Sequence, residues 1–274
     1  MVIFQNKIIY MPGLPPNARR ETIAEYRNQC SGIEWREVRI KPMDGTKISL
    51  CVASVNNIDV CDTRIVYILY FQGRPSEKGI AMDAAASLVW IRDDFLQHGG
   101  NLTDSIPIVI WGQSIGAGVA TNLAAQAHLF QRTESKPPVS LQVLILETPF
   151  ISVRTMLETL YPQKWLPYRH LWPFLWNHLD SSKALGLMRE RFTRAGIESP
   201  KVIILEAGKD ELVPRGHGAV LEKRCRDVGL SVEKRTIGGA FHTEVMVRPE
   251  GRMAVVEAVQ KLSERLFSQS RGEG

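Results

Sequence analysis

The feature that most constrains the fold of this chain is a set of three predominantly apolar runs, at residues 106–111, 141–147 and 201–208. A strand that is apolar at successive positions is buried on both faces, which is typical of parallel strands covered by helices on each side. The segments 80–97 and 115–130, which flank the first run, read as helices. Strands that alternate with helices predict an α/β fold, a three-layer domain with a mostly parallel sheet.

The remaining elements follow from the same periodicities. Apolar side chains of the segment 80–97 share one helical face, and Gly99-Gly100 ends the helix. At 274 residues the chain has the length of one α/β domain, residues 1–274. The face of 80–97 consists of Ile80, Ala84, Leu88, Ile91 and Phe95; further strands are expected at 33–40, 47–55, 64–71 and 231–236, and further helices at 216–228 and 253–268.

An aromatic segment at 156–180 interrupts this alternation. It contains three of the six tryptophans, Trp165, Trp172 and Trp176, together with three prolines. It is too aromatic for a linker and too often interrupted by proline for one long helix. We therefore expect a small cap, inserted at about 151–185 and packed over the ends of the strands.

Composition and charge exclude several functional classes. Apolar residues make up 44% and charged residues 23%, and the net charge is +5, with basic clusters at 189–194 and 223–226 that also carry acids. Such clusters indicate solvated faces; they indicate no nucleic-acid site, and they leave peripheral contact with an anionic membrane open. The N-terminus lacks a signal-peptide pattern and no apolar run is long enough to span a membrane, so we expect a soluble cytoplasmic or peripheral protein. The four cysteines, which form no CxxC pair, are expected to be free thiols: Cys30, Cys51, Cys61 and Cys225.

The first apolar run leads directly into the motif GQSIG, residues 112–116. GxSxG is a weak signal alone, but a strand before it and a helix after it are the context of a nucleophile elbow, which presents a serine on a strained turn. Side chains at 112 and 116 would collide with the helix that packs back on the strand. The motif therefore predicts Ser114 as a nucleophile, with the backbone N–H of Ile115 as a donor to an oxyanion.

A serine nucleophile needs a histidine base and an acid that orients it, in the chain order serine, acid, histidine. His242 lies in a glycine-containing loop after the last strand, so we expect it to be the base. Asp210 follows the apolar run 201–208 and is the expected acid, with Glu211 and Glu147 as rivals. The histidines with other expected positions are His128 in the helix after the elbow, His170 and His178 in the insertion, and His217 at a helix start.

In chain order, GQSIG, LETPF (146–150), AGKDELVP (207–214) and FHTE (241–244) resemble the α/β-hydrolase superfamily. The resemblance is greatest to eukaryotic serine hydrolases of the bud-emergence type, related to monoacylglycerol and lysophospholipid lipases, and extends over nearly the whole chain from Asn6. It implies Ser114, Asp210 and His242 as the triad and ester, thioester or lipid-ester substrates. It also implies no cofactor or metal, and frequent attachment to internal membranes through an N-terminal helix.

The middle of the chain is shorter than this resemblance requires. The segment YFQG (70–73) resembles the loop after the third strand, whose backbone supplies a second oxyanion donor, here the N–H of Arg74. Only 38 residues separate Gly73 from Gly112, whereas a single crossover unit takes about 30 residues and the family fits a helix, a strand and another helix here. We therefore expect one helix and one strand to be missing after Gly73, with a gap between the second and third strands and bare apolar sheet surface.

Taken together, these features predict acyl transfer from a small-molecule or lipid ester to water, with the cap tryptophans either lining an acyl site or simply packing in the cap. Two alternatives stay open: a hydrolase-fold protein with weak or no catalysis, and an acyltransferase with the same triad. The sequence leaves the oligomeric state and the identity of the ester open.

Overall fold

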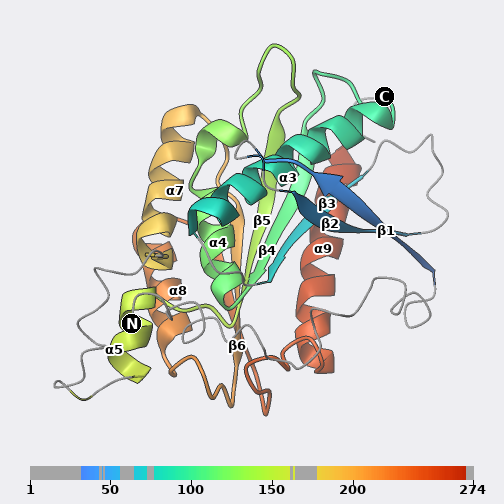
Figure 1. The fold of residues 1–274 in the computed structure, drawn as a ribbon. Helices are drawn as coiled ribbons and strands as arrows, with labels where there is room; N and C mark the ends of the chain where they lie inside the picture. Colours follow the sequence, from blue (N-terminus) through green and yellow to red (C-terminus); the bar gives the residue numbers. More distant parts are fainter. Residues whose placement is uncertain are drawn as a thin grey trace.

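A computed structural model describes residues 32–42, 45, 47–55, 65–72, 77–160, 163 and 178–269. Its centre is a five-stranded sheet in which every neighbouring pair of strands is parallel (Figure 1). The α/β class and the parallel sheet expected from the apolar runs are therefore confirmed. In sheet order the strands are β3 (Tyr67–Gln72), β4 (Ile106–Gln113), β5 (Val139–Glu147), β6 (Lys201–Ala207) and β7 (Val232–Ile237).

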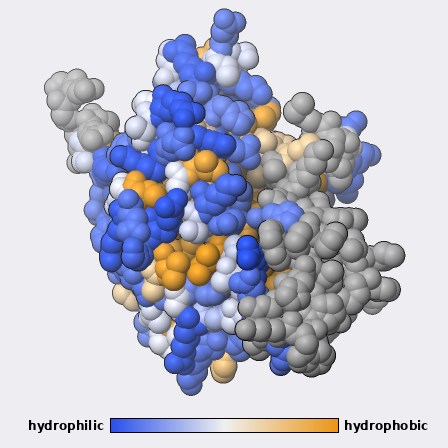
Figure 2. Space-filling model, turned by 90° about the vertical axis from the view of Figure 1, so that its left-hand side faces the viewer, coloured by the Kyte–Doolittle hydropathy of each residue, from blue (hydrophilic) through white to orange (hydrophobic). Residues whose placement is uncertain are grey.

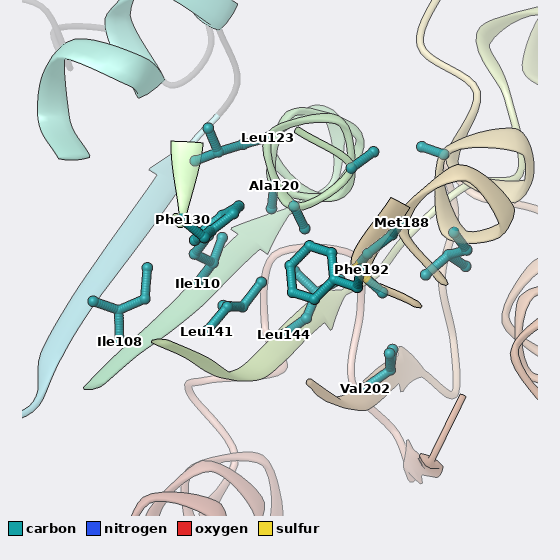
Figure 3. Packing of buried hydrophobic residues seen from close by; sticks show 14 of the residues in the cluster. Ile108, Ile110, Ala120, Leu123, Phe130, Leu141, Leu144, Met188, Phe192 and Val202 are labelled. Atoms are coloured by element: carbon teal, nitrogen blue, oxygen red, sulfur yellow. The ribbon is translucent and has the colours of Figure 1, made fainter. Parts of the chain in front are cut away.

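Helices cover the two faces of this sheet unequally. Four helices pack on one face, around a core cluster that contains Ile110 of β4 and Leu144 of β5 (Figure 3). The opposite face carries α9 (Pro249–Gln269), which packs on Val109 and Ile145. The helices of the first face are α3 (Glu77–Gln97), α4 (Ile115–Ala124), α7 (Ser181–Ala195) and α8 (His217–Asp227).

Two features of the helices differ from the expected pattern. The helix after the elbow ends at Ala124 rather than at residue 130, and a 3₁₀ turn, Ala127–Leu129, follows it. Helix α7 was not expected at all, although its sequence carries end signals: the Asp180 side chain accepts a hydrogen bond from the Lys183 N–H, and Gly196 adopts a left-handed conformation. It begins inside the expected insertion and packs its apolar side, with Met188 and Phe192, into the core.

The outer side of the molecule beside α7 is predominantly hydrophilic, with apolar side chains gathered in small groups near its centre (Figure 2). A helix with one apolar and one polar side is typical of a covering helix. The polar residues of α7, however, weaken its apolar periodicity. The aromatic segment before it also makes the first residue of the helix difficult to recognise in the sequence. These two causes explain why the sequence pattern did not reveal it.

The first two strands, β1 (Ile33–Ile40) and β2 (Ile48–Val55), form a separate antiparallel sheet in the described part of the chain. Arg36 of β1 holds this hairpin to α3 through Asp94, at 3.0 Å. Within the described ranges, β3 is therefore an edge strand of the main sheet, and β2 does not pair with it.

The α9 face of β3 is partly bare. Tyr67, Leu69 and Phe71 pack on the core of the opposite face, so the alternate residues Ile68 and Tyr70 point to the α9 side. Their exposed fractions are 49% and 44%. The sequence analysis expects a missing helix to bare apolar sheet surface, without specifying the face.

Insertion of a family-type helix and strand after Gly73 should raise the melting temperature by about 4–8 °C, because burial of Ile68 and Tyr70 contributes about 2 kcal/mol. Thermal melts of the 274-residue chain and the extended chain provide the comparison. A glycine–serine insertion of equal length serves as the control and should give no increase. Equal melting temperatures for all three chains would show that the sheet is complete as it stands.

Candidate active site

The strand-to-helix junction at Ser114 has the strained geometry of a nucleophile elbow. β4 ends at Gln113, α4 begins at Ile115, and Ser114 between them has φ 54° and ψ −115°. A non-glycine residue rarely adopts such a backbone conformation, and strain of this kind clusters at functional sites. Gly112 is required here because a Cβ at this position would overlap the backbone of Gly116 and Ala117.

The N–H groups of Ser114 and Ile115 differ in their hydrogen bonding. Its own N–H donates to the Glu147 carbonyl at the end of β5, at 2.9 Å. The next N–H, that of Ile115, belongs to the first residue of α4 and therefore has no partner within the helix. Partial positive charge gathers at this helix end, so the Ile115 N–H suits a developing oxyanion.

The expected base and acid are in direct contact. Nδ1 of His242 lies 2.9 Å and 3.0 Å from the two carboxylate oxygens of Asp210. Both side chains are buried, with 5% and 7% of their surface exposed. Since Nδ1 is bound to the carboxylate, Nε2 is the nitrogen that remains to accept a proton.

The Asp210 carboxylate is held ionised by its surroundings. Burial by itself would raise the pKa of Asp210, but the hydrogen bond with His242 and the N–H groups of Val213 and Leu212 outweigh it and lower this pKa. Those two N–H groups donate to Oδ1 at 2.7 Å and 2.9 Å. Glu211, the neighbouring rival, accepts the backbone N–H of His242 at 2.9 Å and so holds the loop rather than the imidazole.

Glu147, the other rival, is completely buried at the end of β5. Its carboxylate accepts the indole N–H of Trp111 and the amide of Gln113, each at 3.0 Å. Burial raises the pKa of Glu147, while these two hydrogen bonds and the charge of His242 act in the opposite direction. Nδ1 of His242 binds Asp210, so the geometry favours Asp210 over Glu147 as the acid. The sequence analysis missed the partners of Glu147, for which the only signal was the polar Gln113 in an apolar strand.

The other histidines of the described ranges occupy different positions from the Asp210–His242 pair. His217 is the first residue of α8, where its Nδ1 accepts the Ile151 N–H, and burial lowers its pKa. His128 is exposed in the 3₁₀ turn rather than inside a helix, and His178 is also exposed. His170 lies outside the described residues.

Within the described part of the chain, no hydrogen bond joins the Ser114 hydroxyl to His242. The second expected oxyanion donor, Arg74, and the cap residues Trp165, Trp172 and Trp176 all lie outside the described residues. The described part of the insertion contributes α5 (Val153–Leu160), whose Val153 and Leu157 share an apolar cluster with Val213 of the acid loop. α5 therefore packs beside the candidate site.

The described ranges contain no group of three or more histidine, cysteine or acidic side chains that could hold a metal ion. Among the helices of those ranges, none is long and apolar enough to cross a membrane.

The sheet order and the elbow define the class of fold, the α/β-hydrolase fold of structurally known esterases. A bacterial heroin esterase superimposes with a TM-score of 0.58 at 17% identity, covering 88% of this chain and 87% of its own. An inhibited esterase B of Lactobacillus rhamnosis gives 0.61 at 14% identity, with coverages of 89% and 91%.

Relatives in sequence match about half of the chain. Lysophosphatidylserine lipase ABHD12 of Bos taurus is 34% identical over 142 residues, 52% of this chain and 31% of that lipase. An uncharacterized protein of Mycobacterium tuberculosis is 33% identical over 142 residues, which are 39% of its length. The match therefore spans well under half of these relatives. No protein-family model matches the sequence.

Proposed function

We propose that this chain is a serine hydrolase of carboxylic esters or thioesters, with lipid-like acyl groups as the preferred substrates. The observation that carries the proposal is the strained Ser114 at a strand–helix junction, on a sheet whose last loop pairs His242 with Asp210. The carboxyl ends of parallel strands lie at the same end of a sheet. Ser114, Asp210 and His242 follow β4, β6 and β7, so all three lie at that end.

The chemistry proceeds by acyl transfer. The Ser114 hydroxyl attacks the ester carbonyl while Nε2 of His242 accepts its proton, and Asp210 holds the imidazole in the required tautomer. The Ile115 N–H stabilises the oxyanion, and His242 then protonates the leaving alcohol or thiol. Water attacks the acyl-enzyme in a second, equivalent cycle and releases the acid. Substrate-free hydrolases often have long serine–histidine separations that tighten when substrate binds.

The preference for lipid-like esters rests on two supports. One is the partial similarity to a lysophosphatidylserine lipase. The other is the apolar cluster of α5 and the acid loop beside the site, which includes Met156 and Val213. The cap tryptophans are proposed to extend this apolar surface along the acyl chain. If the second donor near Arg74 is misplaced by the shortened middle, kcat should be low by about 10²–10³.

A fluorophosphonate probe tests the proposed function directly. We expect one adduct per chain, located on Ser114 by peptide mass spectrometry, and competition by a p-nitrophenyl ester. A panel of esters with two to sixteen acyl carbons should show increasing kcat/KM with chain length. A folded chain that is not labelled would exclude the hydrolase and favour a protein that binds without catalysis. Labelling with transfer to an added alcohol and no hydrolysis would instead indicate an acyltransferase.

A further inference from the structure

Two residues of the described chain other than glycine have positive φ angles, and they lie next to one another in space. Ser114 has φ 54° and Thr148 has φ 44°. The elbow explains the first. Thr148 is β-branched and precedes a proline, so this conformation is costly for it. Its buried hydroxyl finds no hydrogen-bond partner among the described residues.

Glu147 connects these two strained positions. It directly precedes Thr148, and its carbonyl accepts the Ser114 N–H at 2.9 Å. Its side chain reaches the adjacent strand as well, because Oε1 accepts the amide N–H of Gln113, the residue immediately before Ser114. Glu147 thus holds the elbow through one backbone and one side-chain hydrogen bond.

The remaining contacts of this carboxylate fix its position. Oε2 accepts the Trp111 indole N–H at 3.0 Å, so both carboxylate oxygens accept donors, as an ionised carboxylate does. The Tyr70 hydroxyl donates to the Gln113 amide oxygen at 3.3 Å, and the Tyr70 ring packs edge-on against Trp111. The network therefore extends from the edge strand β3 to β5 and leaves the Gln113 amide little freedom.

We propose that Glu147 is a positioning residue for the reaction: it clamps the strained Ser114 elbow to β5. This inference rests on the proposed serine hydrolase function. A completely buried carboxylate with no ion-pair partner among the described residues is costly to maintain. Its two hydrogen bonds to the elbow strand give it a role in holding that elbow.

Glu147→Gln tests the inference. Per active site titrated with fluorophosphonate, we expect kcat to fall about 10- to 100-fold with KM changed less than about threefold, because the nucleophile is less well positioned. A purely structural role would lower the melting temperature and the titrated fraction but would leave kcat per site unchanged.

Glu206→Gln is the matched control, because Glu206 lies on the neighbouring strand β6. Its carboxylate accepts hydrogen bonds from the Gly218 N–H, from Lys234 and from the Thr236 hydroxyl, and among the described residues none of its donors belongs to the elbow. This variant should keep the wild-type kcat and KM per site. If it reproduced the changes of Glu147→Gln, or if Glu147→Gln behaved as wild type, the inference would be wrong.

If Glu147→Gln does not fold, Gln113→Met provides a second test of the same inference. It removes the side-chain tether to Glu147, together with the acceptor of the Tyr70 hydroxyl, and should lower kcat per site by about threefold to tenfold. An unchanged kcat would refute the clamp. A wild-type chain that neither reacts with the fluorophosphonate nor hydrolyses an ester would refute the proposed function itself, whereas failure in the variants alone refutes only the role of Glu147.

Discussion

Ser114→Ala is expected to lower kcat for a short p-nitrophenyl ester by a factor of about 10⁴–10⁶, since without the hydroxyl no acyl-enzyme forms. The fold should persist, because the Ser114 side chain makes no capping hydrogen bond to α4. The measurement is initial-rate kinetics beside a circular dichroism melt. Fluorophosphonate labelling should disappear in parallel.

Ser181→Ala provides the matched control for this substitution. Ser181 is fully buried at the start of α7, and its hydroxyl finds no hydrogen-bond partner among the described residues. The control should keep the wild-type kcat, because the loss of this hydroxyl leaves the carboxyl ends of β4, β6 and β7, where the candidate triad lies, unchanged. Unchanged turnover in Ser114→Ala would show that the strained turn has no catalytic role.

The second large effect is expected for Asp210→Asn, which should lower kcat by about 10⁴. The asparagine amide donates to Nδ1 of His242, so the imidazole proton lies on Nε2. Nε2 then cannot accept the proton of the serine hydroxyl. The acid loop should remain folded, because the retained Oδ1 still accepts the N–H groups of Leu212 and Val213. Steady-state kinetics at the pH optimum measure the effect.

Glu211→Gln is the control for the acid, since it keeps an oxygen for the His242 backbone N–H. We expect its kcat to stay within about threefold of wild type. If Glu211→Gln lost activity while Asp210→Asn kept it, Glu211 rather than Asp210 would be the acid. Comparable losses in both would indicate that the loop position, rather than the imidazole tautomer, limits the reaction.

The two strained backbone positions differ in how well the sequence reveals them. Ser114 is flagged by the glycines at alternate positions around it, because Gly112 is needed for close backbone approach. Thr148 has no such signal, since its positive φ depends on the Leu205 carbonyl of β6, which accepts its N–H at 2.7 Å. A contact between strands that are distant in sequence leaves no local pattern.

The sequence by itself determined the parallel sheet and indicated Ser114, Asp210 and His242 as the candidate nucleophile, acid and base, because apolar periodicity and glycine placement are local consequences of burial and backbone geometry. It also indicated the gap beside β3, because a crossover needs a minimum number of residues. Only the tertiary structure paired His242 with Asp210, showed α7 as a covering helix, and brought Glu147 against Trp111 and Gln113. The physical reason is that a hydrogen bond between side chains on different strands depends on sheet register, and residues 34 or 36 positions apart in the chain carry no common period.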